Sequence, residues 1–162
     1  MTKIGVRDKM SENRRLVMNL DQVLSEWKAD AVVDQINIEK EIFRTPNLHA
    51  KYLEVYVYMK AKLAATDKKV GQLKYLKRKY YRGEMTREEL EKHSWTQFQG
   101  LKPSNSELQS MFDMDPDLNE LEEKLAYFKT GVTSLEYILK QIGIRDYSLK
   151  SVIEYRKFCG GN

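Results

Sequence analysis

Apolar residues recur at alternating steps of three and four over residues 118–142, and this pattern restricts the fold more than any other feature. Steps that average 3.5 residues place these side chains on one face of an α-helix, as in coiled coils. A second stripe of the same period runs from Tyr52 to Leu73. We therefore predict an all-α chain whose long helices carry heptad-like seams. The first stripe consists of Leu118, Leu121, Leu125, Phe128, Val132, Leu135, Leu139 and Ile142.

Two long helices with apolar stripes carry more apolar surface than one small compact domain can bury. Contacts between the subunits of an assembly would bury this surface. An antiparallel pair of helices within one chain would cover it equally well. Periodicity does not choose between these two arrangements.

Start and stop signals predict where the helices begin and end. Thr45-Pro46 reads as the start of a helix that continues to Gly83, since proline at the first helical position loses no needed donor. Asp115-Pro116 starts another helix, and Gly143 ends it. Capping boxes predict short helices after Thr86 and after Ser104. The remaining expected elements are a helix over residues 11–29, an ambiguous stretch over residues 30–44 with raised strand propensity, and a final helix over residues 148–158.

The charge distribution says more than the net charge of +4. Residues 51–82 carry ten basic and two acidic residues, a net charge of +8, and residues 84–123 carry three basic and eleven acidic residues, a net charge of −8. The single cysteine, Cys159, permits no internal disulfide, so a disulfide-stapled secreted domain is excluded. Neither a signal peptide nor an apolar run of membrane-spanning length is evident, which favours an intracellular setting without a membrane partner.

The usual catalytic and cofactor-binding patterns are missing from the sequence. The glycines form no phosphate-binding loop, and the two histidines have no Cys-x-x-Cys partner for zinc. The acidic stretch at residues 113–124 fails as a calcium loop because Leu118 stands where glycine is needed and Lys124 where glutamate is needed. Asp115 and Asp117 read instead as acids at a helix N-terminus. We therefore expect no enzyme activity, no cofactor and no metal site.

The strongest chemical signal is a basic, tyrosine-containing helix over residues 68–82. Seven of its fifteen residues are basic and none is acidic. A row of cations at helical pitch can neutralise successive phosphates, and tyrosines can stack on unpaired bases. The predicted nucleic-acid-binding residues are Lys68, Lys69, Lys74, Tyr75, Lys77, Arg78, Lys79, Tyr81 and Arg82.

The basic helix is also compatible with roles that do not involve nucleic acid. A run of charges is most often a solvated helix face, with Tyr80 in a core. An acidic protein or a membrane surface would also attract the cations, although a membrane-bound helix needs a larger apolar face. The acidic block at residues 84–123 fits a subunit interface, a partner contact, or screening of the basic helix by the chain itself.

Three segments resemble the UvsY-type recombination mediator proteins of T-even-like tailed phages. They are the end of the basic helix at Tyr80-Tyr81-Arg82-Gly83, the helix from Leu121 to Gly143, and the tail at residues 144–158, which reads Ile-Arg-Asp-Tyr-Ser-Leu-Lys-Ser-Val-Ile-Glu-Tyr-Arg-Lys-Phe. The resemblance covers roughly residues 20–160. The family's DNA-binding motif aligns either on Leu73-Lys74 or on the paired tyrosines, and we favour Lys74, Lys77 and Arg78 as its contacts.

The resemblance implies a non-enzymatic mediator that binds single-stranded DNA in the cytoplasm of the infected host cell. It also implies loading of a RecA-like phage recombinase onto strands coated by the phage single-strand DNA-binding protein, in recombination, recombination-dependent replication and repair. A ring-like homo-oligomer of about six or seven subunits is implied as well. Its oligomerisation helices would span residues 116–158, adding Leu149, Val152 and Ile153 to the first stripe.

The domain organisation expected from these features is simple. Residues 1–18 form a flexible N-terminus, and residues 19–162 form a single helical domain with a DNA-binding helix at residues 46–82. The alternative function is a non-catalytic helical adaptor or structural protein whose basic face binds an acidic protein partner.

Overall fold

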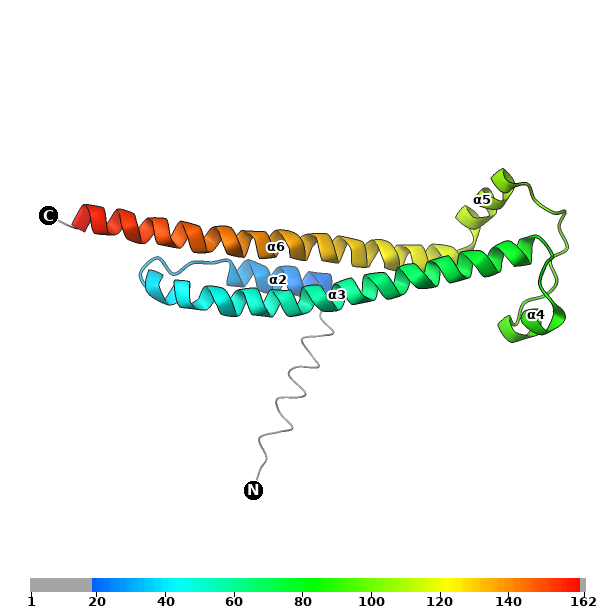
Figure 1. Cartoon of the computed structure of the whole chain (residues 1–162), viewed down its shortest axis with the longest axis horizontal. Coiled ribbons are helices and arrows are strands. Elements are labelled where there is room, and N and C mark those ends of the chain that lie inside the picture. The colour runs from blue at the N-terminus through cyan, green and yellow to red at the C-terminus, as the bar shows by residue number, and fades with distance from the viewer. Residues whose placement is uncertain (1–18, 161–162) are drawn as a thin grey trace, which may run out of the picture. The chain divides into compact units, whose positions relative to one another are not determined.

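The computed structural model describes residues 19–160 and shows an all-α protein, as the sequence predicted (Figure 1). No strand occurs within these residues. The expected flexible N-terminus, residues 1–18, lies outside the described residues, as does the first part of the helix expected over residues 11–29. The helices are α2 (Leu20–Asp30), α3 (Ile38–Tyr81), α4 (Arg87–His93), α5 (Asn105–Met114) and α6 (Pro116–Gly160).

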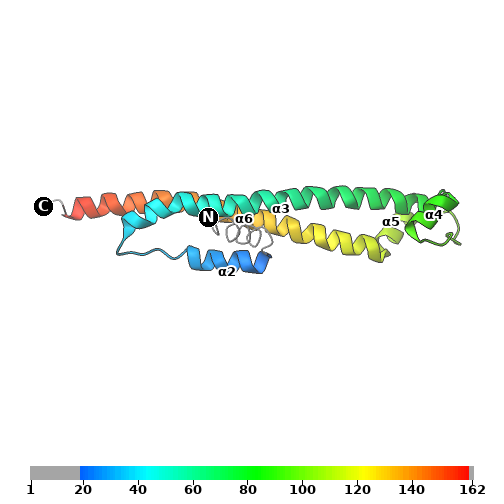
Figure 2. The same ribbon diagram turned by 90° about the horizontal axis from the view of Figure 1, so that it is seen from below.

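The described chain divides into two compact units. Of the described residues, the first unit combines residues 19–61 with residues 129–160, and the second unit is Lys62–Phe128. Helices α3 and α6 contribute to both units, and Figure 2 shows them from a second direction.

Helices α3 and α6 pair within one chain in each unit. In the first unit the hydroxyl of Tyr56 donates a hydrogen bond to Glu136 at 3.0 Å, and Glu41 forms an ion pair with Arg145. Residue numbers increase along α3 while those of their contacts on α6 decrease, so the two helices run antiparallel. In the second unit Lys74 of α3 likewise reaches Glu122 of α6. The structure therefore contains the intramolecular pair, one of the two arrangements that periodicity left open.

Much of the predicted seam lies in the core of the single chain. In the second unit Leu108, Phe112 and Leu118 form a buried cluster, and Leu73 and Tyr81 pack against it. Of the predicted oligomerisation residues, Leu118, Val132, Leu135, Ile142 and Leu149 are buried; Leu121, Leu125, Phe128, Leu139 and Ile153 are half-buried; and Val152 is exposed.

The expected helix start at Thr45-Pro46 is wrong, because Pro46 lies inside α3. The hydroxyl of Thr45 instead donates a hydrogen bond to the carbonyl oxygen of Glu41 at 3.1 Å, one turn earlier. The helix begins at Ile38, where the carboxylate of Asp34 accepts hydrogen bonds from the backbone N–H groups of Ile36 and Asn37. These local bonds form an Asx-type turn that leads into the helix at Asn37.

The expected helix end at Gly143 is also wrong, since α6 continues to Gly160. The separate final helix expected at residues 148–158 is the last part of α6. The hydroxyl of Ser148 donates to the carbonyl oxygen of Ile144 at 3.0 Å, and that of Ser151 donates to the carbonyl oxygen of Tyr147 at 3.1 Å. Both serines thus bond back along a continuous helix and do not cap a new one.

The remaining boundaries are confirmed by their capping geometry. Thr86 and Ser104 each form the predicted capping box at the start of α4 and α5. Gly83 has a φ of 68°, and its N–H donates to the carbonyl oxygen of Tyr80 while that of Glu84 donates to Lys79. This pair of hydrogen bonds is a Schellman motif, which ends α3 at a left-handed position that glycine adopts without strain.

Hydrogen bonds and ion pairs of buried charged side chains hold α2 against α3 and α6 within the first unit. Arg145, on α6, donates hydrogen bonds to the carbonyl oxygens of Asp30 and Ala31 at the end of α2 and forms an ion pair with the buried Glu41. A guanidinium at a helix C-terminus satisfies carbonyls that have no partner within the helix. The carboxylate of Asp30 in turn accepts hydrogen bonds from Lys51 and Tyr52.

Candidate nucleic-acid interface

The part of α3 within the second unit carries exposed cations and one exposed tyrosine on its solvent-facing half. Lys68, Lys69 and Arg78 are exposed, and none of them forms an ion pair within residues 19–160. The side chain of Tyr75 is 65% exposed and lies between them in sequence. We call these four residues the exposed basic face. All four belong to the set predicted from sequence.

Three further predicted cations flank this face but have partners in the same unit. Lys74 forms an ion pair with Glu122 at 2.6 Å, and Lys79 forms one with Glu89 at 2.5 Å. Arg82 donates a hydrogen bond to the side chain of Asn105 at 2.8 Å. Exposed ion pairs are weak, so a phosphate can compete for Lys74.

Lys77, one of the three residues favoured by the resemblance, does not occupy the expected position. Its side chain is 8% exposed, and its ammonium lies 2.8 Å from Asp115 and 2.7 Å from Asp117. The ammonium also lies 4.7 Å from the centroid of the Trp95 ring. In this geometry the charge of Lys77 is used inside the unit, and a phosphate contact does not fit.

The buried partner of Lys77 is held in its charged form. Burial alone would raise the pKa of Asp115, but hydrogen bonds from Lys77 and Tyr81 outweigh burial and hold this pKa below its ordinary value. The same carboxylate accepts hydrogen bonds from the N–H groups of Asp117 and Leu118. The prediction that Asp115 serves the N-terminus of α6 is confirmed.

Tyr81 is half-buried and packs against the core of the second unit. Its hydroxyl donates a hydrogen bond to Asp115 at 2.6 Å, and its ring contacts Phe98 and Phe112. Tyr80 packs against Phe98 and Trp95. Of Tyr75 and Tyr81, the two tyrosines in the predicted set, only Tyr75 is placed on the exposed basic face.

The acidic block at residues 84–123 screens the basic helix, one of the three roles considered for it. Its members Glu89, Asp115, Asp117 and Glu122 each contact a lysine of α3. Sequence reasoning did not assign these partners, because the pairing depends on how α4 and α6 fold back onto α3. Spacing along one helix carries no signal for such contacts.

The described part of the chain offers neither a metal centre nor a membrane span. No group of three or more His, Cys, Asp or Glu side chains there is placed to hold a metal ion. None of its helices combines the length and apolarity that crossing a membrane requires.

Exposed cations without ion-pair partners beside an exposed tyrosine on one helix are typical of the class of polyanion-binding proteins. Such a face lacks the donor and acceptor pattern that reads base edges, and it suits a flexible phosphate backbone.

Comparison with known proteins makes the assignment specific. The chain belongs to the UvsY family of recombination, repair and single-stranded DNA-binding proteins, whose family model matches residues 26–162. Among solved structures, the recombination mediator protein UvsY of bacteriophage T4 is similar in two crystal lattices. One shows 18% identity and a TM-score of 0.76, covering 87% of this chain and 99% of the other. The second shows 20% identity and a TM-score of 0.78, covering 88% and 98%. No match was found among curated protein sequences.

Proposed function

We propose that this protein is a recombination mediator that binds single-stranded DNA along the exposed basic face of α3. The observation that carries the proposal is the combination of Lys68, Lys69 and Arg78, exposed and without carboxylate partners in the described chain, with the exposed Tyr75. Three ammonium or guanidinium groups supply phosphate contacts, and the tyrosine ring supplies a stacking surface for a base. The family membership supports single-stranded DNA as the polyanion.

In this role the protein acts without catalysis and without a cofactor. It promotes loading of a RecA-like phage recombinase onto strands coated by the phage single-strand DNA-binding protein, in recombination, recombination-dependent replication and repair. Its place of action is the cytoplasm of the infected host cell. These steps extend the coarser family description of recombination, repair and single-stranded DNA binding.

A ring-like homo-oligomer of about six or seven subunits is part of the proposal. Since much of the first stripe is buried within the chain, the exposed side of α6 is the better candidate for contact between subunits. Large exposed side chains of α6 in the first unit include Tyr137, Ile144, Tyr147, Tyr155 and Phe158. Large exposed apolar residues gathered on one element are typical of protein–protein contacts.

Fluorescence polarisation with labelled oligothymidylate tests the DNA-binding site. The Lys68→Glu/Arg78→Glu variant should bind at least about tenfold more weakly, and its dependence on salt should be shallower because phosphate contacts are lost. Lys28→Glu/Lys92→Glu, at exposed lysines of α2 and α4, is the control with the same change of net charge. Equal losses in both variants would locate the DNA elsewhere.

Light scattering tests the assembly. The native chain should have the mass of several subunits, and Tyr155→Asp/Phe158→Asp should reduce it. A monomeric mass for the native chain would reject the ring, while leaving the DNA-binding proposal to its own experiment.

A further inference from the structure

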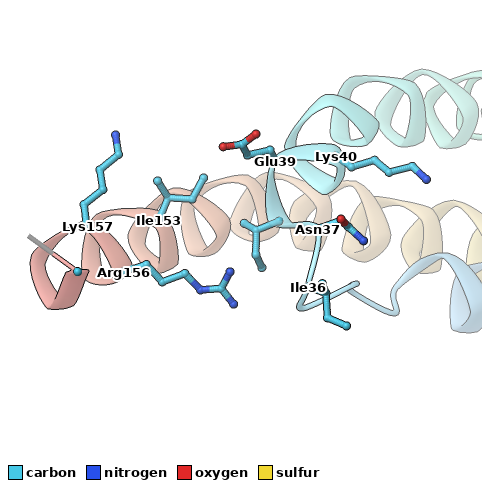
Figure 3. A pocket seen from close by; sticks show the side chains of 9 residues that line it. Ile36, Asn37, Glu39, Lys40, Ile153, Arg156 and Lys157 are labelled. Atoms are coloured by element: carbon cyan, nitrogen blue, oxygen red, sulfur yellow. The ribbon is translucent and has the colours of Figure 1, made fainter.

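The first unit contains a groove between the start of α3 and the end of α6 (Figure 3). It has a volume of about 740 Å³ and is lined by residues 36–40 on one side and by Ile153, Arg156 and Lys157 on the other. An adjoining cavity of about 360 Å³ shares Ile38 and Arg156 with it. Residues of the chain segment that leads into α3 line both cavities, which we together call the α3–α6 groove.

Aliphatic side chains form part of the walls of the α3–α6 groove. Ile36 stands at its edge with 87% of its surface exposed, and Ile153 lines it half-buried. Val33, Leu149 and Val152 add further aliphatic surface in the adjoining cavity. An isoleucine this exposed beside other aliphatic side chains loses contact with water when a matching apolar side chain binds.

The formal charge of the side chains that line the groove is positive. Lys40, Arg156 and Lys157 line it, and none of the three forms an ion pair within residues 19–160. Glu39 is the single carboxylate of the main cavity lining, so its formal charge is three minus one, or +2. Arg156 donates a hydrogen bond to the carbonyl oxygen of Gln35 at 2.8 Å, which orients the guanidinium toward the segment before α3 without neutralising it.

We propose that the α3–α6 groove binds an acidic peptide segment of a partner protein, with apolar side chains between its carboxylates. The carboxylates contact Arg156, Lys157 and Lys40, and an apolar side chain packs on Ile36 and Ile153. This site goes beyond the proposed DNA-binding function and lies in the other compact unit.

The lining favours a peptide over nucleic acid and over the chain's own acidic block. No aromatic side chain lines either cavity, so bases find no stacking surface, whereas the aliphatic side chains of the lining suit the apolar residues of a peptide. The acidic block at residues 84–123 is engaged elsewhere, since Leu108, Phe112 and Leu118 are buried and Asp115 pairs with Lys77.

The direct test is polarisation of a fluorescein-labelled peptide that alternates aspartate or glutamate with leucine or phenylalanine. A second peptide replaces each apolar residue by serine at the same charge. We expect the first to bind and the second to bind at least about tenfold more weakly. Arg156→Glu/Lys157→Glu should weaken the first peptide about tenfold, since two attractive pairs become repulsive. The Ile36→Ser variant should weaken it severalfold.

Matched variants keep the experiment decisive. Lys28→Glu/Lys92→Glu makes the same double charge reversal at exposed lysines of α2 and α4 and should leave peptide binding intact. Arg156→Gln is a milder second variant, and circular dichroism verifies that the helix content of each variant is unchanged. Equal peptide affinity in the native protein and in Arg156→Glu/Lys157→Glu overturns the proposal.

The remaining outcomes identify a different occupant. If the serine peptide binds equally well, simple charge attraction replaces the peptide site. If Arg156→Glu/Lys157→Glu loses single-stranded DNA binding, the groove binds DNA and the peptide proposal is wrong. If that variant loses the native oligomeric mass, the groove binds a second copy of the chain and the peptide proposal is again wrong. The DNA-binding proposal fails separately, when Lys68→Glu/Arg78→Glu binds DNA normally. That variant should bind the peptide like the native protein.

Discussion

Replacing Glu122 by glutamine removes the carboxylate that holds the ammonium of Lys74 at 2.6 Å. The two side chains, of Lys74 and Glu122, are 40% and 43% exposed, so their ion pair belongs to the solvent-screened kind. Such pairs contribute about 0.2–1 kcal/mol, which a competing phosphate must overcome. If single-stranded DNA uses Lys74, the Glu122→Gln variant should bind it about 1.4- to 5-fold more tightly.

The salt dependence of DNA binding gives a second measure of whether Lys74, freed from Glu122, contacts a phosphate. Each phosphate contact on a single strand adds about 0.7 to the slope of log affinity against log salt. A Lys74 freed from Glu122 should therefore steepen the slope by up to about 0.7 when salt is varied from about 0.05 to about 0.4 M. The assay is polarisation of labelled oligothymidylate at each salt concentration.

The neighbouring Glu123 provides the matched control. It is exposed, lies one residue further along α6 and forms no ion pair within the described chain. Glu123→Gln changes the net charge by the same amount but frees no lysine. If Glu122→Gln and Glu123→Gln change affinity and slope equally, the effect is a general charge effect and the reasoning about Lys74 is wrong.

Three further predictions concern the second unit. The Lys77→Met variant should have a free energy of unfolding in urea about 3 kcal/mol lower than that of the native protein. This value is at the lower end of the cost of leaving a buried carboxylate without its cation, because Tyr81 and two backbone N–H groups still bond to Asp115. The control Arg78→Met, on the exposed basic face, should change the free energy of unfolding by less than about 0.5 kcal/mol. The pKa of Asp115 lies below its ordinary 3.8, so the stability that its charge contributes is complete above about pH 5 and is lost as pH falls, and Asp115→Asn should flatten the acid limb of a thermal-denaturation series. Gly83→Ala should cost about 1 kcal/mol by calorimetry, because it places a side chain at a φ of 68°, with DNA affinity unchanged.

The sequence was a good guide wherever a short local pattern decides the structure. Capping boxes need only four residues, and both predicted boxes, at Thr86 and at Ser104, are present. The predictions from Thr45-Pro46 and Gly143 were wrong because proline and glycine only make the free energy of helix formation less favourable. Tertiary contacts on both sides of these positions outweigh that penalty. The buried Glu41 and Leu48 on either side of Pro46 show how firmly this part of α3 is held.

The sequence predicted all four residues of the exposed basic face, but it did not predict which of the other basic residues and tyrosines of α3 are buried or paired. The sequence placed Lys77 and Arg78 in the same row of cations, although one is buried and the other exposed. Their side chains point about 100° apart on a helix, and only the packing of α6 decides which one meets Asp115. Sequence periodicity identifies the helix that carries charge, and the tertiary fold selects the cations that remain available.

The two tryptophans of the chain, Trp27 and Trp95, fall in different units. Trp27 contacts the ring of Tyr52 edge-on, and Trp95 stacks on His93 and faces the ammonium of Lys77. Each ring thus sits in an environment that disappears when its own unit unfolds. A Trp27→Phe chain becomes an optical reporter for the unit that carries the exposed basic face, and a Trp95→Phe chain reports the unit that carries the groove. Fluorescence melts of the two would separate the cooperativity of each half of the molecule with no added label.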